Sequence, residues 1–325
     1  MDIEGLGEST TYEYQAYVNE WNATTGQYED RFGAVASFTT LGASVTVNPG
    51  YLSCYEVPAI NHLSGSSTTG TVSARDDKWY RYYTTNSKQQ IATHTYTLNN
   101  KRVRNYSVLY DGSKYAPLWS AFAMHASMWP DNGALRDDDW TSDPAISMTQ
   151  QTGLDNALTV GYSRGHFVAS QYRKSSDGQN LQTFYYSNQA PQWQNGFNSG
   201  VWSTLEQKVV ANAPSGRDTL YVVVGVLYEG TTKTLPSGNL NVPIPSHFYT
   251  CLMKCSFNTS GTMTAASGIA YLYTNESHTG SSYNSSNYVT TIDAIEQRTG
   301  FDFFHSVPGN LQTTAESSAT PLWSN

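Results

Sequence analysis

A chain of 325 residues is long enough for one large domain with an appendage, and it can bury a substantial core. Only 14% of its residues are charged and 24 are tyrosines, a profile that favours a β-rich extracellular protein over a helical cytosolic one. No apolar run reaches the roughly 18 residues of a membrane-spanning helix, so we expect no membrane partner. The N-terminus lacks a basic start and an apolar stretch, which argues against a signal peptide in this sequence.

The net charge of −8 belongs mainly to the N-terminal segment. Residues 1–58 hold eight acidic residues and one basic residue, a net charge of −7. The remainder then holds 17 basic and 18 acidic residues, a net charge of −1. Phosphate contacts favour a basic surface, so a nearly neutral main part neither supports nor excludes a nucleic-acid substrate.

Residues 1–40 are predicted to form strands. Alternation over residues 11–18 and a second strand-like run over 35–40 favour a pair, which cannot be stable alone. Leu6, six residues before Tyr12, and the pattern after it resemble the late strands of a fibronectin type III sandwich. The resemblance implies that residues 1–40 are the C-terminal part of such a domain, with the rest upstream of this sequence.

Residues 41–74 are expected to be a linker and a first strand, with a flexible Ser- and Gly-rich run at 64–70. Short strands and turns are predicted beyond this run, at residues 78–85, 92–98 and 106–110, and residues 119–125 then lead to a polar stretch at 131–143.

The clearest helix is predicted at residues 199–212. Val201, Leu205 and Val209 recur every four residues, and Pro214 ends the pattern.

The C-terminal third combines a strand, a helix and a tail. A continuous β-branched run at residues 220–228 predicts a strand buried on both faces. A second helix is predicted at 291–299, with Gly300 as its C-cap. Residues 306–325, rich in Ser, Thr and Ala, are expected to be a loose tail.

The three cysteines leave two alternatives open. Cys251 and Cys255 would lie roughly 13 Å apart on a strand, which is too far for a mutual disulfide. A bridge from Cys54 to one of them is one alternative, and three buried reduced thiols are the other. The spacing has no C-x₂-C pair, so we expect no structural zinc site.

Two short motifs carry the candidate chemistry: S-R-G-H at residues 163–166 and N-S-G-V-W-S-T-L-E at residues 198–206. A histidine such as His166 can take a proton from water at physiological pH. Arg164 can offer a fork of donors to phosphate oxygens. Taken alone, however, His166 is more often a structural histidine.

Asn198 and Glu206 add oxygen atoms to this set. A side-chain amide oxygen is a hard ligand suited to Mg²⁺, although the ordinary role of Asn198 would be a helix N-cap. On one continuous helix, Glu206 would be offset by about 80° from Asn198 and would still reach water near that face. Its ordinary role would be a surface glutamate. A base, a cation, a neutral oxygen ligand and an acid are what metal-assisted phosphodiester hydrolysis requires.

Together the motifs resemble the DNA/RNA non-specific endonuclease family, the sugar-non-specific ββα-metal nucleases of the secreted bacterial type. The family hallmark is D-R-G-H followed by N-x-G-x-W-x-x-L-E, and the separation here is 32 residues (198 − 166). Flanking stretches at 136–144 and 183–192 match as well. The resemblance spans residues 75–305. It implies an α+β, ββα-metal nuclease fold with a central antiparallel sheet and flanking helices.

The resemblance also implies a Mg²⁺-dependent endonuclease that acts on DNA or RNA, with Mn²⁺ able to substitute. His166 is then the general base that activates the attacking water. Asn198 is the direct ligand of one Mg²⁺, and Glu206 holds a water molecule of that metal. Arg136 and Arg164 are implied to stabilise phosphate charge.

Ser163 departs from the family pattern, which has an aspartate there, so the support of His166 is left unassigned. The rival interpretation is a catalytically weak nucleic-acid-binding or adhesion protein that keeps the nuclease fold. Ser163 and the fibronectin-like start favour this rival, whereas the intact His166, Asn198 and Glu206 argue against it.

Two further features receive ordinary interpretations. Asn188 lies in a matching segment but is expected to be structural, and the acidic run at 137–139 is expected to be a solvated loop. Composition and family habit place the protein outside the cell or at its surface. DNA or RNA preference and oligomeric state stay open.

Overall fold

The computed structural model describes residues 11–39, 53–59, 88–98, 101–128, 133–136, 138–146, 151–237 and 240–323. The chain divides into two compact units, residues 1–47 and residues 48–325. None of the helices in the described ranges is long and apolar enough to span a membrane. The strand expected at residues 78–85 lies outside the described residues.

The described part of the first unit, residues 11–39, is an antiparallel hairpin. Strand β1 (Thr11–Asn22) pairs with β2 (Gln27–Thr39), and the register shifts between Gln15 and Tyr17. Gly26 adopts a φ of 67° in the connecting turn, a conformation that glycine tolerates best. Both strands expected in this segment are therefore present, and each is longer than the alternation predicted.

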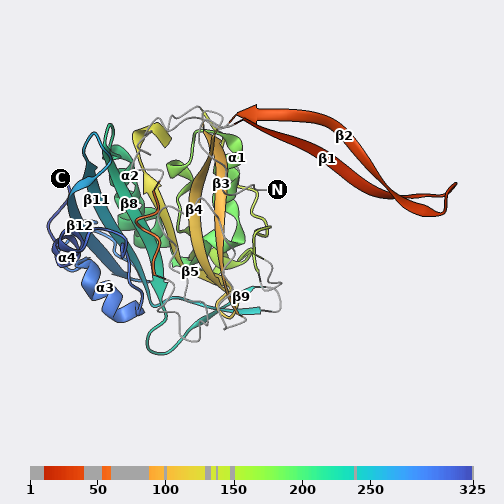
Figure 1. The fold of residues 1–325 in the computed structure, drawn as a ribbon. Coiled ribbons are helices and arrows are strands. Elements are labelled where there is room, and N and C mark those ends of the chain that lie inside the picture. Colours follow the sequence, from red (N-terminus) through yellow and green to blue (C-terminus); the bar gives the residue numbers. More distant parts are fainter. Residues whose placement is uncertain are drawn as a thin grey trace. The chain divides into compact units, whose positions relative to one another are not determined.

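A seven-stranded antiparallel sheet forms the centre of the second unit (Figure 1). Its strands lie in the order β13 (Val289–Thr290), β12 (Met263–Thr274), β11 (His247–Phe257), β8 (Asp218–Leu227), β5 (Ala116–Met124), β4 (Lys101–Asp111) and β3 (Gln89–Leu98). The β-branched run at the centre becomes β8, which is buried along almost its whole length as predicted. The central antiparallel sheet expected for an α+β fold is confirmed.

Layers cover both faces of this sheet. Tyr221 and Val223 of β8 face a core shared with α3 (Ile292–Thr299) and α4 (Gly309–Glu316), which lie beside β11 and β12 in Figure 1. The alternate residues of β8 face a second core, shared with α2 (Ser203–Ala211). Since β-strand side chains alternate between faces, a strand covered on both sides needs an uninterrupted apolar sequence.

The chain between β5 and β8 builds the layer that holds the candidate site. It contains a two-stranded sheet of β6 (Tyr162–His166) and β7 (Gln189–Trp193), the short helix α1 (Asp177–Leu181), and α2. Although β5 and β8 are neighbours in the sheet, residues 125–217 separate them in sequence. A further hairpin, β9 (Thr234–Ser237) with β10 (Leu240–Pro243), follows β8.

The helices partly match the sequence prediction. Helix α3 is confirmed, and Gly300 caps it in the left-handed conformation with a φ of 73°. The helix predicted at 199–212 is shorter: α2 begins at Ser203, after a π-helical segment (Gln194–Trp202) in which Gly200 has non-helical angles. The loose tail expected from residue 306 is wrong for residues 309–316, which form α4.

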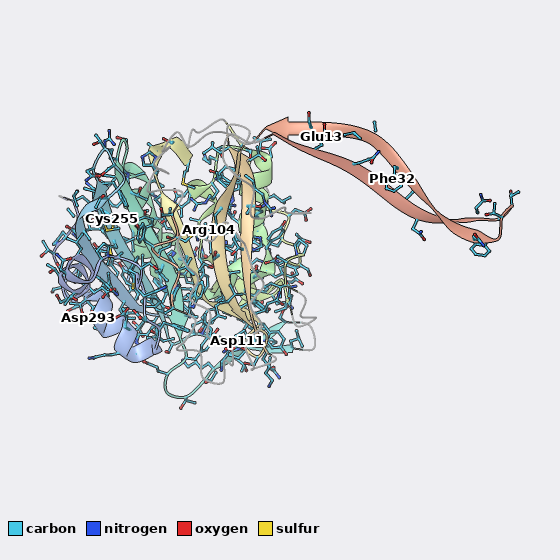
Figure 2. All side chains as sticks on the ribbon, viewed as in Figure 1. Glu13, Phe32, Arg104, Asp111, Cys255 and Asp293 are labelled. Atoms are coloured by element: carbon cyan, nitrogen blue, oxygen red, sulfur yellow. The ribbon has the colours of Figure 1, made fainter. Side chains whose placement is uncertain are left out.

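Residues 53–59 pack into the second unit, although they fall in the range expected as a linker and a first strand. Cys54 and Val57 are buried in the core that α3 and α4 share. Glu56, which is fully buried, forms an ion pair with Arg104 of β4. Arg104 is labelled in Figure 2. All three cysteines are buried and free, so the alternative of reduced thiols holds.

Candidate functional site

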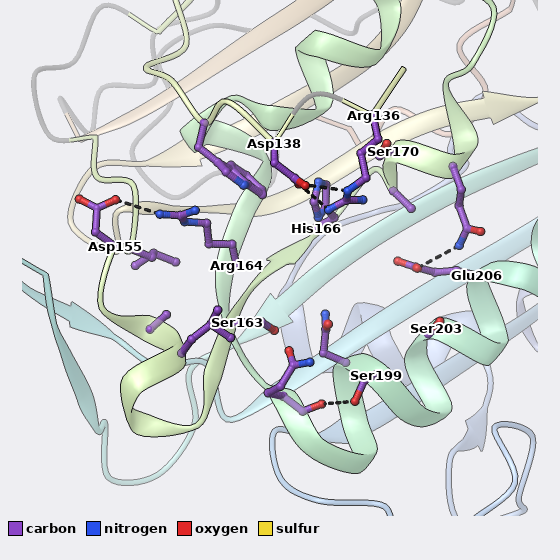
Figure 3. A pocket seen from close by; sticks show the side chains of 18 residues that line it. Arg136, Asp138, Asp155, Ser163, Arg164, His166, Ser170, Ser199, Ser203 and Glu206 are labelled. Atoms are coloured by element: carbon purple, nitrogen blue, oxygen red, sulfur yellow. Dashed lines mark hydrogen bonds and ion pairs between the residues drawn. The ribbon is translucent and has the colours of Figure 1, made fainter. Parts of the chain in front are cut away.

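A pocket of about 690 Å³ lies in the layer formed by residues 125–217, the part of the chain that connects β5 to β8 (Figure 3). Its walls come from Arg136, Asp138 and Trp140, from the 154–158 and 169–171 segments, from β6, and from the π-helical segment with α2. The fold brings all five residues expected from the sequence into this lining: Arg136, Arg164, His166, Asn198 and Glu206.

His166, the last residue of β6, is half-buried between two aromatic rings. Its imidazole centroid lies 4.7 Å from that of Trp140 and 5.2 Å from that of Phe184. Within the described part of the chain, its buried Nε2 has no hydrogen-bond partner. Burial, with the charge of Arg136, lowers the pKa of His166 to about 3, and Asp138 opposes this shift. The imidazole is therefore neutral at neutral pH.

Ser163 supports the strand pair. Its hydroxyl donates a hydrogen bond of 3.2 Å to the backbone oxygen of Gln192, its register partner on β7. The serine that stands in place of the hallmark aspartate thus forms a hydrogen bond between β6 and β7. The orientation of His166 rests on its packing against Trp140 and Phe184.

Asn198 lies inside the π-helical segment rather than at a helix N-cap. The N-cap residue of α2 is Trp202, and its side chain makes no cap bond. The Asn198 amide nitrogen instead donates a 2.5 Å hydrogen bond to the side-chain oxygen of Gln192. A Cβ atom on Gly165 would lie 2.7 Å from that same oxygen, so only glycine lets Gln192 occupy this position. The N-cap interpretation of Asn198 is therefore wrong.

Glu206 lies in the first turn of α2 and is half-buried. Its Oε2 accepts a hydrogen bond of 3.2 Å from the Gln171 amide. Burial raises the pKa of Glu206 to about 7, while the Gln171 bond and the charge of Arg136 oppose the rise. The expected 80° offset from Asn198 does not apply, because the backbone is not helical at Gly200.

Each arginine of the pocket is paired with a carboxylate. Arg136 contacts Oδ1 of Asp138 through Nε at 3.0 Å and Nη2 at 2.8 Å. Arg164 donates from Nη2 to Oδ1 of Asp155 at 2.9 Å. The expected solvated loop thus contributes Asp138 to the pocket, although its side chain is 67% exposed. Asp155 also lines the pocket, and no local motif in the sequence predicts its role.

Asn188 is fully buried behind the site. Its side chain accepts a hydrogen bond from the backbone nitrogen of Val168 at 2.9 Å and donates to the oxygens of Val168 and Thr183. These bonds fix the chain just after His166. A structural role for this residue agrees with the expectation from the sequence.

Comparisons with known proteins agree with this architecture. Residues 74–310 match the family model described as DNA/RNA non-specific endonuclease. A nuclease of Serratia marcescens is 28% identical over 241 residues, covering 71% of this chain and 80% of that protein. A Nostoc nuclease is 27% identical over 230 residues, covering 67% and 78%. The human mitochondrial nuclease EXOG is 29% identical over 158 residues, covering 46% and 42%.

A solved structure gives the same fold. A chain from the crystal structure of the EndoG/EndoGI complex superposes with a TM-score of 0.56 at 23% identity, covering 70% of this chain and 92% of that one. The family match over most of the chain supports nuclease activity on nucleic acids. The chain therefore belongs to the DNA/RNA non-specific endonuclease family.

Proposed function

We propose that the chain is a Mg²⁺-dependent endonuclease that hydrolyses phosphodiester bonds of DNA and RNA, with Mn²⁺ as a substitute metal. The observation that carries the proposal is the convergence of His166, Asn198 and Glu206 on one pocket. These residues come from a strand, a π-helical segment and a helix, and the fold places all three in the lining of the same pocket.

His166 is the proposed general base. A base must be unprotonated at the working pH, which the lowered pKa of His166 satisfies. The negative charge of a bound phosphate raises the pKa of the imidazole towards the range in which a general base accepts a proton efficiently. Among the described residues, the buried Nε2 of His166 has no hydrogen-bond partner, so it can accept a hydrogen bond from a water molecule. In this role His166 accepts the proton that the attacking water loses.

Asn198 and Glu206 are the proposed metal-binding residues. The Asn198 NH₂ group is committed to Gln192, so the amide is oriented and its oxygen is the atom that suits a hard cation. Glu206 offers a carboxylate whose raised pKa falls when a cation favours its ionised form. When bound, Mg²⁺ supplies positive charge that stabilises the phosphate oxygens during displacement.

Arg136 and Arg164 are the proposed phosphate-binding groups. Arg164 lies over the Trp140 ring with 5.6 Å from Cζ to the centroid, and Arg136 lies 5.2 Å from the centroid of Phe184. Donors of this kind address the nucleic-acid backbone rather than base edges, so we expect slight sequence preference.

Cleavage of supercoiled plasmid and of RNA, with Mg²⁺ or with EDTA, tests this function. Wild type is expected to cleave both with Mg²⁺ and neither with EDTA. The Mg²⁺ concentration that gives half-maximal cleavage is expected to be about tenfold or more higher for Asn198→Ala than for wild type. Asn195→Ala is the matched control, since Asn195 is exposed in the same segment and outside the pocket lining.

Two results would contradict the proposal. An unchanged Mg²⁺ requirement in Asn198→Ala would remove Asn198 from the metal site. Absence of cleavage by wild type with either Mg²⁺ or Mn²⁺ would favour the catalytically weak binding protein instead.

We also propose that residues 1–40 are the fibronectin-like end of a separate domain, in an exported protein. The β1–β2 hairpin, which forms a unit of its own within residues 1–47, supports this division. A chain of residues 48–325 is then expected to cleave plasmid as fast as the full chain. A large loss of cleavage would contradict the boundary.

A further inference from the structure

The guanidinium of Arg164 is already occupied by protein groups. Its Nη2 donates to Asp155 at 2.9 Å, and its Nε donates to the backbone oxygen of Gly153 at 2.5 Å. Figure 3 shows Arg164 turned towards Asp155 at the edge of the pocket. The Nε and Nη2 edge of the guanidinium, which would bind a phosphate, thus already donates hydrogen bonds to Gly153 and Asp155.

Arg136 repeats the arrangement on the other wall. Its Nε and Nη2 both contact one oxygen of Asp138, beside His166 (Figure 3). The two carboxylates are well exposed, with side chains 76% accessible for Asp155 and 67% for Asp138. Exposed ion pairs of this kind are weak and can be exchanged for another anion.

We propose that Asp155 and Asp138 determine substrate affinity by competing with backbone phosphates for Arg164 and Arg136. Binding of nucleic acid exchanges each carboxylate for a phosphate, and the displaced carboxylate then lies close to a polyanion. Both effects weaken binding. This inference rests on the proposed function, because it assigns a competitor to each proposed phosphate-binding group.

The competition selects for polymers. A substrate that presents several phosphates at once can displace both carboxylates together, and it gains from the release of many counterions. A short product offers fewer phosphates to the same two pairs. The carboxylates therefore favour long nucleic acid over the fragments that cleavage produces.

Asp155→Asn isolates the charge. The amide keeps the shape of the side chain, and the Gly153 oxygen still holds Nε of Arg164. Asp293→Asn is the charge-matched control, because Asp293 lies on α3, which packs against the opposite face of the sheet from the pocket.

The test combines equilibrium binding of a fluorescent DNA duplex in EDTA with steady-state cleavage in Mg²⁺. Asp155→Asn is expected to lower both Kd and KM by about two- to fivefold, with kcat unchanged, because the lost competition acts equally on ground state and transition state. Asp293→Asn is expected to change neither. In an Arg164→Ala background, Asp155→Asn is expected to lower Kd by less than it does with Arg164 present, because only the repulsion between the carboxylate and the phosphates is then removed.

Four outcomes would overturn the inference. They are unchanged Kd and KM in Asp155→Asn, an equal gain in Asp293→Asn, and the same gain without Arg164. The fourth is a lower kcat with a higher Mg²⁺ requirement, which would identify Asp155 as a metal ligand. If wild type does not cleave at all, the proposed function fails as well. Normal wild-type cleavage with any of the four overturns this inference alone.

Discussion

The side-chain amide of Asn198 donates a hydrogen bond of 2.5 Å to the side-chain oxygen of Gln192. Gln192 in turn lies against Gly165, where a Cβ atom would come within 2.5 Å of the Gln192 Cβ. The glycine of the first motif therefore positions the asparagine of the second through one glutamine. The two motifs form a single packed unit.

Gly165→Ala tests this connection. The added methyl must displace Gln192 and with it the Asn198 amide, so we expect kcat to fall about tenfold or more while the fold persists. The measurement is plasmid cleavage across a Mg²⁺ titration, with the melting temperature as a check on folding. Gly178→Ala is the control, because a Cβ there meets open space. Full activity in Gly165→Ala would show that Gln192 does not position Asn198.

Mg²⁺ binding is expected to depend on pH through Glu206. Burial raises the pKa of this carboxyl to about 7, so it is protonated below that pH and ionised above it. A cation binds the ionised form, so the half-saturating Mg²⁺ concentration should fall as pH rises from about 6 to about 8. Rates measured over a grid of pH and Mg²⁺ check this. The same pH dependence in Glu206→Gln would assign it to another group.

The ion pair between Glu56 and Arg104 is expected to anchor residues 53–59 to the sheet. Both side chains are almost fully buried, so Glu56→Gln leaves the Arg104 charge without its partner. We expect a loss of about 3–5 kcal/mol in the free energy of unfolding. Urea denaturation checks it, with the exposed Glu276→Gln as the control. Equal stability of the two variants would contradict the anchoring role.

A carboxylate cluster between α3 and α4 is expected to make stability fall with rising pH. The Asp293, Glu296 and Glu316 oxygens lie within 4.8 Å of one another. Burial, and for Glu316 also the charge of Glu296, raises the pKa of Glu296 to about 7 and of Glu316 to about 8, from 4.5. Because the folded state holds these protons more tightly, stability is greatest below about pH 4.5 and is lost up to about pH 8.

Glu316→Gln tests the cluster. The amide removes one charge, so the melting temperature at pH 8 should rise by a few degrees above wild type, while the two proteins should differ less at pH 5. A variant that melts lower than wild type at pH 8 would contradict the repulsion.

Much of the fold follows from local pattern. The uninterrupted run of β8 and the Gly300 C-cap identify their elements because the relevant physics lies within a few residues. The start of α2 could not be predicted in this way. Val201 of the π-helical segment and Leu205 of α2 fit one helical period, so the pattern hides the change of backbone between the two elements. A distant contact constrains the backbone of the π-helical segment at Gly196, where a Cβ would lie 2.4 Å from Thr279 Oγ1.

Helix α4 and the carboxylate that pairs with Arg164 could not be predicted from local pattern either, because they too depend on tertiary contacts. Ala315 is buried because Gly268 of β12 allows close approach, where a Cβ would lie 2.4 Å from the Ala315 oxygen. Asp155 meets Arg164 only once the fold brings its segment beside β6. Motif spacing identified the residues of the pocket, whereas the side chains that orient or compete with them depend on tertiary packing.

The central claim is tested most directly by single-turnover cleavage of plasmid DNA in Mg²⁺ by wild type and His166→Ala. Removal of a general base should slow the reaction by about 10²- to 10⁴-fold without altering DNA binding in EDTA. His247→Ala, a change at the first residue of β11 and outside the pocket lining, should cleave at the wild-type rate. Cleavage by His166→Ala as fast as by wild type would contradict the assignment of His166 as the base.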